Sequence, residues 1–305
     1  MADVETIRIG TRGSPLALAQ AHMVREALGQ AAEIRVIKTT GDHILDRPLS
    51  EIGGKGLFTK EIEEQLADHR IDIAVHSMKD MPTALPEGLV IGAMLERADP
   101  RDALVSKKAR SIAGLPENAH VGTASLRRGA ILLARRPDLR ISTLRGSVQT
   151  RLKRIEEGAF DATLLARAGL DRLGMGEETA TPLDTSEMLP AVAQGAIGIE
   201  YAVQREDIGA MLEAIHHEDT GLCVDAERAF LAELDGSCRT PIAAHAVVDD
   251  GKVAFRALVA RPDGSELIER EATFSRDDAV NGAAAIGREV RSIIGSDFFA
   301  PAPGR

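Results

Sequence analysis

Short apolar strand segments alternate with helical segments along the first two-thirds of the chain, and this alternation limits the possible folds most strongly. The segment TIRIGT at 6–11 leads directly into a helical pattern at 12–28, where Ser14 can cap the helix and Pro15 suits its first turn. Further strands are predicted at 33–40, 71–77, 88–95, 102–106 and 161–166, and further helices at 59–69 and 166–173. Strands that alternate with helices predict α/β layers with mainly parallel sheets.

The last third of the chain has a different order of elements. A helix is predicted at 223–234, an antiparallel meander of strands at 241–248, 252–260 and 266–274, and a closing helix at 277–294. The turn sequences DDG and PDG separate the three strands. This order predicts a smaller C-terminal α+β domain.

The start of the chain and the segment 119–137 follow the same order of strand, Gly-Thr, small residues and helix. The pairs Gly10-Thr11 and Gly122-Thr123 occupy corresponding places, and a serine able to cap a helix follows each pair. At such a turn the N–H groups of the helix N-terminus attract anions. The sequence therefore predicts two anion-binding turns.

The composition argues against several classes of function. The net charge of −10 disfavours a general nucleic-acid or anionic-membrane binder, and no apolar run approaches the ~18 residues typical of a membrane span. The N-terminal segment MADVETIRIG has no signal-peptide pattern, and the cysteines, Cys223 and Cys238, are too few for a disulfide framework. We therefore expect a cytoplasmic protein that binds neither nucleic acid nor membrane. Cys223 and His76 are interpreted as interior residues, and no Cys/His spacing indicates a metal site.

Positive charge is concentrated in one region of this acidic chain. Residues 121–154 contain nine Lys or Arg side chains and a single acid, Asp138. Four of these cations are expected to form a solvated helix face: Arg135, Arg136, Lys153 and Arg154. Six arginines of the chain instead lie mostly at or just after predicted strand ends: Arg12, Arg127, Arg128, Arg145, Arg151 and Arg172.

Arginine pairs bidentately with carboxylate or phosphate, so several converging guanidinium groups indicate a ligand with several anionic groups. A single-stranded nucleic acid is the rival ligand. Proteins that bind single strands add stacking aromatic side chains, and this chain has no Trp and one Tyr.

Three polar segments could carry chemistry. Lys79-Asp80 follows a buried-type strand just before a proline, at the end where α/β sheets bind ligands, although such a pair is most often structural. The glycine-rich segment around Lys55 has the composition of a lid or of a plain exposed loop. Cys238 lies in the polar turn ELDGSCRTP, where Arg239 would favour the reactive thiolate.

Nine motifs, in one order and over nearly the whole chain, resemble those of the porphobilinogen deaminase family. They are RIGTRGSPLALAQ (8–20), GDHILDRPLSEIGGKGLFTKEIE (41–63), DIAVHSMKDMP (72–82), ERADPRDALVS (96–106), VGTASLRRGAILLARRPDL (121–139), LRGSVQTRL (144–152), LARAGLDRLG (165–174), LPAVAQGAIGIE (189–200) and DGSCRTPI (235–242).

The resemblance implies a fold, a cofactor and a reaction. Members of the family have two domains like periplasmic binding proteins and a third that carries a dipyrromethane cofactor, attached by a thioether to the cysteine that corresponds to Cys238. They are transferases that condense four porphobilinogen molecules head to tail with loss of ammonia. They then release hydroxymethylbilane, a linear tetrapyrrole of haem biosynthesis, by hydrolysis. The resemblance places domain 1 at 1–95 and 196–214, domain 2 at 100–190 and domain 3 at 217–305, and a monomer is expected.

The resemblance also assigns roles to residues. Asp80, with Lys79, corresponds to the catalytic group, and we expect a buried carboxylate that stabilises the azafulvene cation left when ammonia departs. The cofactor is expected to contact Cys238, Arg127, Arg128, Ser125, Thr123, Lys79, Asp80, Arg145 and Gln194. The substrate, whose pyrrole carries an acetate and a propionate, is expected to contact Arg12, Ser14, Gln20, Lys55, Arg145, Arg151 and Arg172.

Two positions depart from the family pattern, Glu51 and Arg167, and their part in ligand binding stays open. The alternative function is a two-lobed binding protein for a polycarboxylate or other polyanion, which would share the fold but would not need a reactive thiol.

Overall fold

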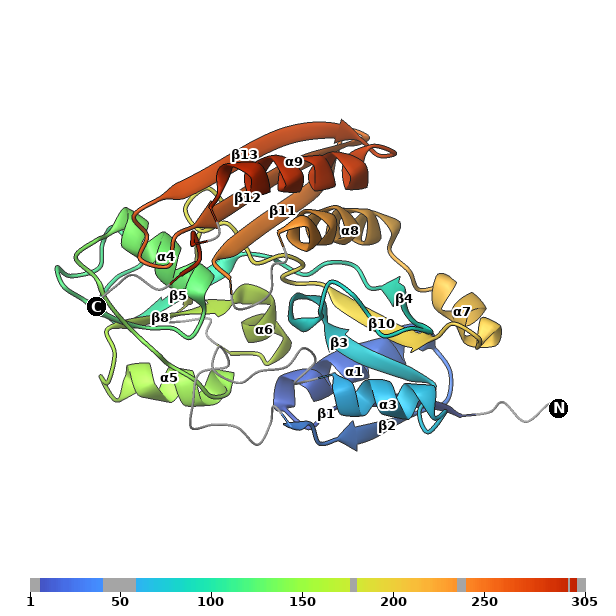
Figure 1. Ribbon diagram of the computed structural model, residues 1–305. Coiled ribbons are helices and arrows are strands. Elements are labelled where there is room, and N and C mark those ends of the chain that lie inside the picture. The colour runs from blue at the N-terminus through green and yellow to red at the C-terminus, as the bar shows by residue number, and fades with distance from the viewer. Residues whose placement is uncertain (1–5, 41–58, 176–179, 235–239, 296, 301–305) are drawn as a thin grey trace. The chain divides into compact units, whose positions relative to one another are not determined.

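A computed structural model describes residues 6–40, 59–175, 180–234, 240–295 and 297–300 of the protein (Figure 1). The chain forms two compact units, one of residues 1–98 and 195–221 and the other of residues 99–194 and 222–305. The second unit contains the predicted domain 2 together with most of the predicted domain 3. The division into three domains therefore stays a prediction.

The first unit is built on a five-stranded sheet with the order β2-β1-β3-β10-β4. Its strands are β1 (Ile7–Arg12), β2 (Ala32–Ile37), β3 (Ile73–Ser77), β4 (Leu89–Met94) and β10 (Ile197–Ala202). Its helices are α1 (Pro15–Leu28), α3 (Lys60–Ala67) and α7 (Glu206–Glu213). Successive side chains of β3 alternate between faces, so Ile73 and Val75 pack with α1 and α7 while Ala74 packs with α3.

The α/β part of the second unit repeats this plan, with a five-stranded sheet in the order β7-β6-β8-β5-β9. Its strands are β5 (Asp102–Ser106), β6 (His120–Gly122), β7 (Arg140–Ser142), β8 (Ala162–Ala166) and β9 (Ala180–Pro182). Its helices are α4 (Leu126–Arg135), α5 (Val148–Glu156) and α6 (Arg167–Arg172). Leu104 packs in the cluster that holds α4, whereas Ala103 and Val105 pack with α5 and α6.

Both sheets are mainly parallel, as expected, and each is mixed because one of its five strands runs antiparallel to the other four. In the first, β1 runs parallel to β2 and β3, whereas β10 runs antiparallel to β3 and β4. In the second, β6 runs parallel to β7 and β8, whereas β5 runs antiparallel to β8 and β9. In each sheet the antiparallel strand is the one by which the chain enters from the other unit. An apolar strand pattern indicates that a strand is buried but not in which direction it runs. The sequence pattern therefore could not predict that β5 and β10 run antiparallel to their neighbours.

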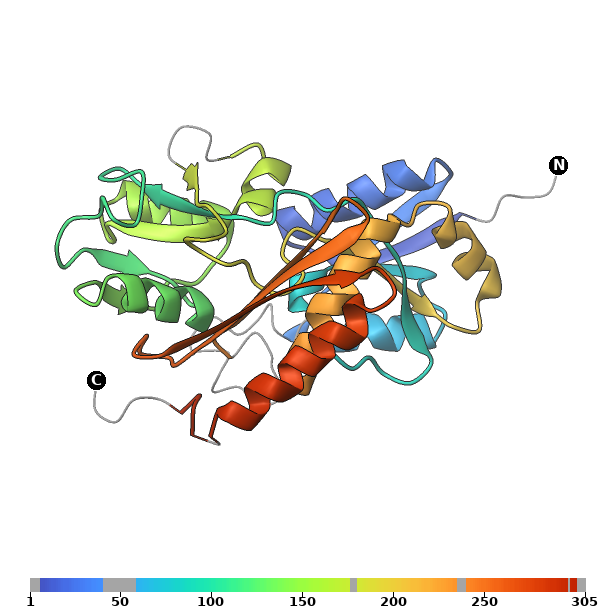
Figure 2. The same cartoon turned by 90° about the horizontal axis from the view of Figure 1, so that it is seen from above.

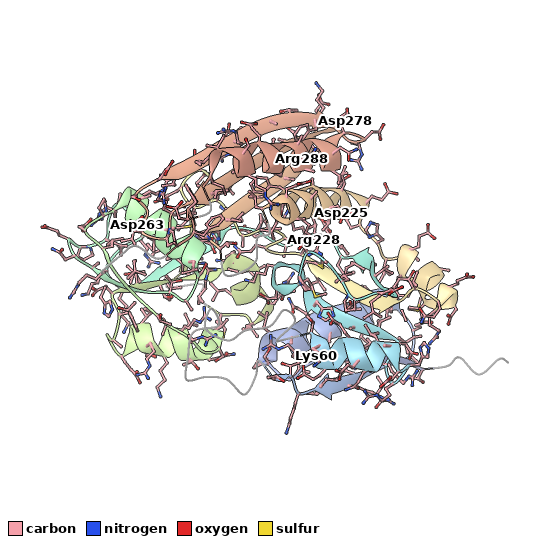
Figure 3. All side chains as sticks on the ribbon, in the orientation of Figure 1. Lys60, Asp225, Arg228, Asp263, Asp278 and Arg288 are labelled. Atoms are coloured by element: carbon pink, nitrogen blue, oxygen red, sulfur yellow. The ribbon has the colours of Figure 1, made fainter. Side chains whose placement is uncertain are left out.

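The C-terminal part of the second unit contains the predicted antiparallel meander, in the order β11-β12-β13. Its elements are α8 (Glu218–Glu233), β11 (Ile242–Asp249), β12 (Lys252–Ala260), β13 (Leu267–Ser275) and α9 (Ala279–Ile293). Both helices pack on one face of the sheet, where Phe255 contacts Phe230 of α8 and Phe274 of β13 (Figure 2). Arg288, which is labelled on α9 in Figure 3, also forms an ion pair of 2.6 Å with Glu233 at the end of α8.

Candidate functional site

In the first unit, the predicted site residues follow two adjacent parallel strands. Arg12 ends β1, and Lys79 and Asp80 follow β3 in a short 3₁₀ helix, Met78–Asp80. Since β1 and β3 are parallel neighbours, their carboxyl ends meet at one edge of the sheet. The structure therefore brings Arg12 to the same edge as the Lys79-Asp80 pair.

The expectation of a buried Asp80 is wrong in this structure. Met78 fills the interior position of the 3₁₀ helix with 1% exposure, Lys79 is half-buried and Asp80 is exposed. One tight turn cannot direct all three side chains inward. The Asp80 carboxylate is thus accessible from solvent at the sheet edge.

Two predicted substrate-binding residues of this unit already make hydrogen bonds within the protein. Ser14 caps α1, because its side-chain oxygen accepts from the Ala17 N–H at 3.2 Å. Gln20 is buried, and its Nε2 donates to the Ser77 hydroxyl at 2.7 Å. Ser77 is the last residue of β3, so this bond ties α1 to the strand that leads to Asp80.

In the second unit, two helices begin just after two adjacent parallel strands. The cap of α4 is Ser125, which follows β6, and the cap of α5 is Ser147, which follows β7. Thr123 supports the first turn, because its Oγ1 accepts from the Ser125 N–H at 3.1 Å. Both helix N-termini therefore lie at the carboxyl edge of the sheet, where their N–H groups favour anions.

The two arginines of α4 and one aspartate form a cluster of buried charges in the second unit. Arg127 pairs with Asp102 at 2.8 Å and Arg128 pairs with it at 2.7 Å. All three are nearly inaccessible, with exposures of 4%, 6% and 0%. Burial would raise the pKa of Asp102, but the charges of both arginines hold that pKa far below its ordinary value. One carboxylate between two guanidinium groups leaves a net positive charge.

Backbone and amide groups hold this arginine pair in place. Arg127 donates to the Leu189 carbonyl at 2.7 Å, and Arg128 donates to the Leu164 carbonyl at 2.9 Å. Gln194, which was predicted to contact the cofactor, donates from Nε2 to Asp102 at 3.1 Å.

Sequence reasoning missed Asp102. The available signal was an acid at the head of the apolar strand DALVS, since a charge in such a strand is rarely buried unless it is paired.

The remaining predicted arginines follow the neighbouring strands. Arg145 and Arg151 come after β7, and the Nε of Arg151 donates to the Gly146 carbonyl at 3.0 Å. Gly146 has a φ of 109°, which a residue with a side chain rarely adopts. Arg172 ends α6 after β8, and burial lowers its pKa to about 10. All the predicted arginines of this unit thus follow strands β6, β7 and β8, which are neighbours in the sheet.

Other predictions have mixed outcomes. His76 is an interior histidine as expected, because its Nε2 lies 3.0 Å from the buried Glu200 carboxylate. Cys223 is buried in α8, also as expected. The expectation of a solvated face is wrong for Arg136, which pairs with Asp138 and donates to carbonyls of residues 112–116. Cys238, Lys55 and Glu51 lie outside the described residues.

The geometry is suited to a ligand with several carboxylates. The carboxyl edge of the second unit combines a buried positive pair, two helix N-termini and further arginines. A dipyrromethane with four acid side chains fits this set, because the positive charges and N–H donors there outnumber the single carboxylate, Asp102. None of the helices in the described part of the chain combines the length and the apolar character needed to cross a bilayer.

Comparison with known proteins gives matches over nearly the whole chain. Residues 7–210 match the family described as "Porphobilinogen deaminase, dipyromethane cofactor binding domain", and residues 221–294 match "Porphobilinogen deaminase, C-terminal domain". The chain is 54% identical over 300 residues to porphobilinogen deaminase of Paracoccus denitrificans, with 96% of each chain covered. It is 52% identical over 310 residues to chloroplastic porphobilinogen deaminase of Oryza sativa subsp. japonica, which covers 98% of this chain and 87% of that protein.

A solved structure of a periplasmic substrate-binding protein of an ABC transporter from Coxiella burnetii is similar at 14% identity with a TM-score of 0.43. That match covers 70% of this chain and 92% of the other.

Proposed function

Because the chain belongs to the porphobilinogen deaminase family, we propose that it joins four porphobilinogen molecules head to tail on a dipyrromethane primer. One ammonia leaves at each addition, and hydrolysis releases hydroxymethylbilane. The observation that carries this proposal is the buried Arg127–Asp102–Arg128 cluster, with its net positive charge, inside the segment that matches the cofactor-binding domain.

We propose Cys238 as the attachment point of the primer. When bound, the primer would supply the free pyrrole carbon from which the chain of units grows. Arg239 follows the cysteine in the sequence and would favour its thiolate, which is the form that makes a thioether. The other cysteine, Cys223, is 5% exposed inside α8 and is not suited to such a reaction.

The second unit would bind the acid side chains of the pyrroles. Arg127 and Arg128 would each direct hydrogen-bond donors to primer carboxylates, while Asp102 neutralises one of their charges and sets their orientation. Arg145, Arg151 and Arg172 would hold the acids of the substrate and of the growing chain. Thr123 and Ser125 keep the first turn of α4 in place beside them.

The first unit would supply the chemical group. As the ammonium of porphobilinogen leaves, the remaining pyrrole becomes a cation, and the Asp80 carboxylate would stabilise it. The same carboxylate would accept the proton that the new ring loses after carbon–carbon bond formation. Lys79 and Arg12 lie at the same sheet edge and would orient the acid side chains of the substrate.

The test is a mass balance on purified protein with porphobilinogen. An enzyme should consume four porphobilinogen molecules and release four of ammonia for every tetrapyrrole formed. A two-lobed binding protein would return the porphobilinogen unchanged, with no ammonia, and that result would overturn the proposal.

We also propose that the protein acts as a monomer in the cytoplasm. The low cysteine content supports a reducing compartment. Light scattering behind size-exclusion chromatography would test the monomer, with a mass near 32.5 kDa expected.

A further inference from the structure

Glu227 of α8 is a buried carboxylate that the proposed chemistry does not use. It has 0% exposure, and it accepts two backbone hydrogen bonds, from the Ala193 N–H at 2.6 Å and from the Ala246 N–H at 2.8 Å. Burial of a carboxylate is costly unless hydrogen bonds compensate it. A side chain kept at such a cost in this place calls for a reason beyond filling space.

One of the two residues that donate to Glu227 is Ala246, which belongs to β11, an edge strand of its sheet. An edge strand presents N–H groups that no neighbouring strand can accept. Glu227 accepts one of these groups with one oxygen and therefore fastens α8 to the sheet edge.

The second donor, Ala193, has the left-handed backbone conformation, with a φ of 59°. This conformation is unfavourable for alanine, so surrounding contacts must hold it. The Gln194 N–H closes the turn by donating to the Ala191 carbonyl at 3.0 Å. The other oxygen of Glu227 thus holds a strained turn immediately before Gln194.

Gln194 connects this turn to the arginine pair. Its side-chain Nε2 donates to the Pro100 carbonyl at 2.8 Å and to the Asp102 carboxylate at 3.1 Å. Asp102 in turn pairs with Arg127 and Arg128. Glu227 is therefore linked to both guanidinium groups. The path runs by hydrogen bond to Ala193, along the peptide backbone to Gln194, and by hydrogen bond and ion pairs through Asp102.

We propose that Glu227 is a positioning residue: through the 193–194 turn and Asp102 it fixes the direction in which Arg127 and Arg128 present their donors to carboxylates. This role rests on the proposed function, since those carboxylates belong to the primer and the growing chain. If this turn changes conformation, Gln194 loses its hydrogen bond to Asp102. The Asp102 carboxylate is then no longer held in one position between the two arginines.

The test compares Glu227→Gln with Phe230→Leu. Glutamine has the shape of glutamate but no charge. Its amide NH₂ would face the N–H of either Ala193 or Ala246, where glutamate offers an acceptor. Phe230 lies one helical turn away in α8 and contacts Phe255, so its variant weakens the packing of α8 on the sheet but keeps the Glu227 carboxylate that accepts from Ala193. For each protein we would measure the unfolding midpoint, the fraction of chains that carry the primer by intact mass, and KM and kcat.

We expect Glu227→Gln to lower the primer-loaded fraction and to raise KM roughly tenfold, the equivalent of about 1.4 kcal/mol. Phe230→Leu should lower the unfolding midpoint and leave loading and KM unchanged. The same loading and KM in both variants would reduce Glu227 to a purely structural residue and overturn the inference. A wild-type protein with neither primer nor turnover would instead overturn the proposed function.

A double-mutant cycle tests the path. If Glu227 acts through Gln194, adding Gln194→Ala to Glu227→Gln should cost little more loading than either change alone. Fully additive losses would contradict the path. If Glu227→Gln does not fold, Gln194→Ala alone must lower the loaded fraction relative to Phe230→Leu, and unchanged loading would reject the proposal.

Discussion

At the scale of single residues, the proposed catalytic carboxylate and the arginine pair are held in opposite ways. Asp80 is exposed at the end of a 3₁₀ helix, whereas Arg127 and Arg128 are buried around Asp102. An exposed carboxylate can be changed with little effect on folding. A buried pair cannot, because removal of one member leaves the other without its counter-charge.

Asp80→Asn should therefore keep the fold and lose the reaction. Asparagine has the size and hydrogen-bonding reach of aspartate but no charge to stabilise the substrate cation. We expect kcat to fall by about a hundredfold to a thousandfold, while the unfolding midpoint and the primer-loaded fraction stay unchanged. Asp80→Glu keeps the charge and should retain more activity than Asp80→Asn. Wild-type turnover in both variants would show that Asp80 is only a structural partner of Lys79.

Arg128→Leu and Arg145→Leu should differ in stability but not in their effect on binding. Arg128 is 6% exposed and paired with Asp102, so its loss should cost about 3–5 kcal/mol of unfolding free energy. Arg145 is half-buried, and its loss should cost less. Both variants should carry less primer or stall during chain growth. Denaturant titration and intact mass would measure the two effects, and normal loading in both variants would indicate that neither arginine binds carboxylates.

At the scale of elements, Asp72 joins β1, β3 and the start of α7. It follows the turn before β3 and pairs with Arg8 at 2.6 Å and with Arg205 at 2.9 Å. Burial alone would raise the pKa of Asp72, but hydrogen bonds from Arg8 and Arg205 lower it to about 2. A carboxyl whose pKa is lower in the folded state stabilises the fold above its unfolded pKa, near 3.8. That contribution is lost as the pH falls toward 2.

Asp72→Asn should remove this contribution. We expect a loss of about 1–2 kcal/mol at pH 7, less than full linkage predicts, because both arginines are partly exposed to solvent. Thermal unfolding of wild type and variant between pH 7 and pH 2.5 would measure it. The gap between the two midpoints should narrow as the pH falls through 3.8 toward 2, and a gap that does not change with pH would contradict the assignment.

Elements were also the scale at which the sequence predicted most. The helix predicted within 12–28 is present as Pro15–Leu28 with Ser14 as its cap, and the C-terminal meander is present as well. Local signals suffice there, because caps, turns and alternation depend on neighbouring residues. The direction of β5 and β10 did not follow from the sequence, since both depend on pairing between residues far apart in the chain.

For the site, the sequence placed residues at strand ends but could not pair them. Arg127 and Arg128 were expected to bind carboxylates, and in the structure they hold Asp102, which lies more than twenty residues earlier in the chain. Glu227 was missed for the same reason, because both of its donors come from other segments. Asp80 was placed at the correct strand end but with the wrong burial, because a single turn decides which way that side chain points.

At the scale of the whole molecule, the chain repeats one α/β plan twice and adds a C-terminal sheet. In both units the site residues lie at the carboxyl edge of parallel strands, β1 and β3 in one and β6, β7 and β8 in the other. The first unit presents the Asp80 carboxylate beside Lys79 and Arg12, and the second presents several arginines. One exposed carboxylate among several cationic groups matches a reaction in which a cation forms on a substrate whose side chains are acids.

The covalent primer is the central claim, and the intact mass of the purified protein tests it most directly. The wild type should exceed its sequence mass by one dipyrromethane and give colour with Ehrlich's reagent. Cys223→Ala, a matched change at the other cysteine, should carry the same added mass. Cys238→Ser should fold, have the bare sequence mass and lack activity. Added pyrrole mass on Cys238→Ser, or its absence from the wild type, would contradict the account.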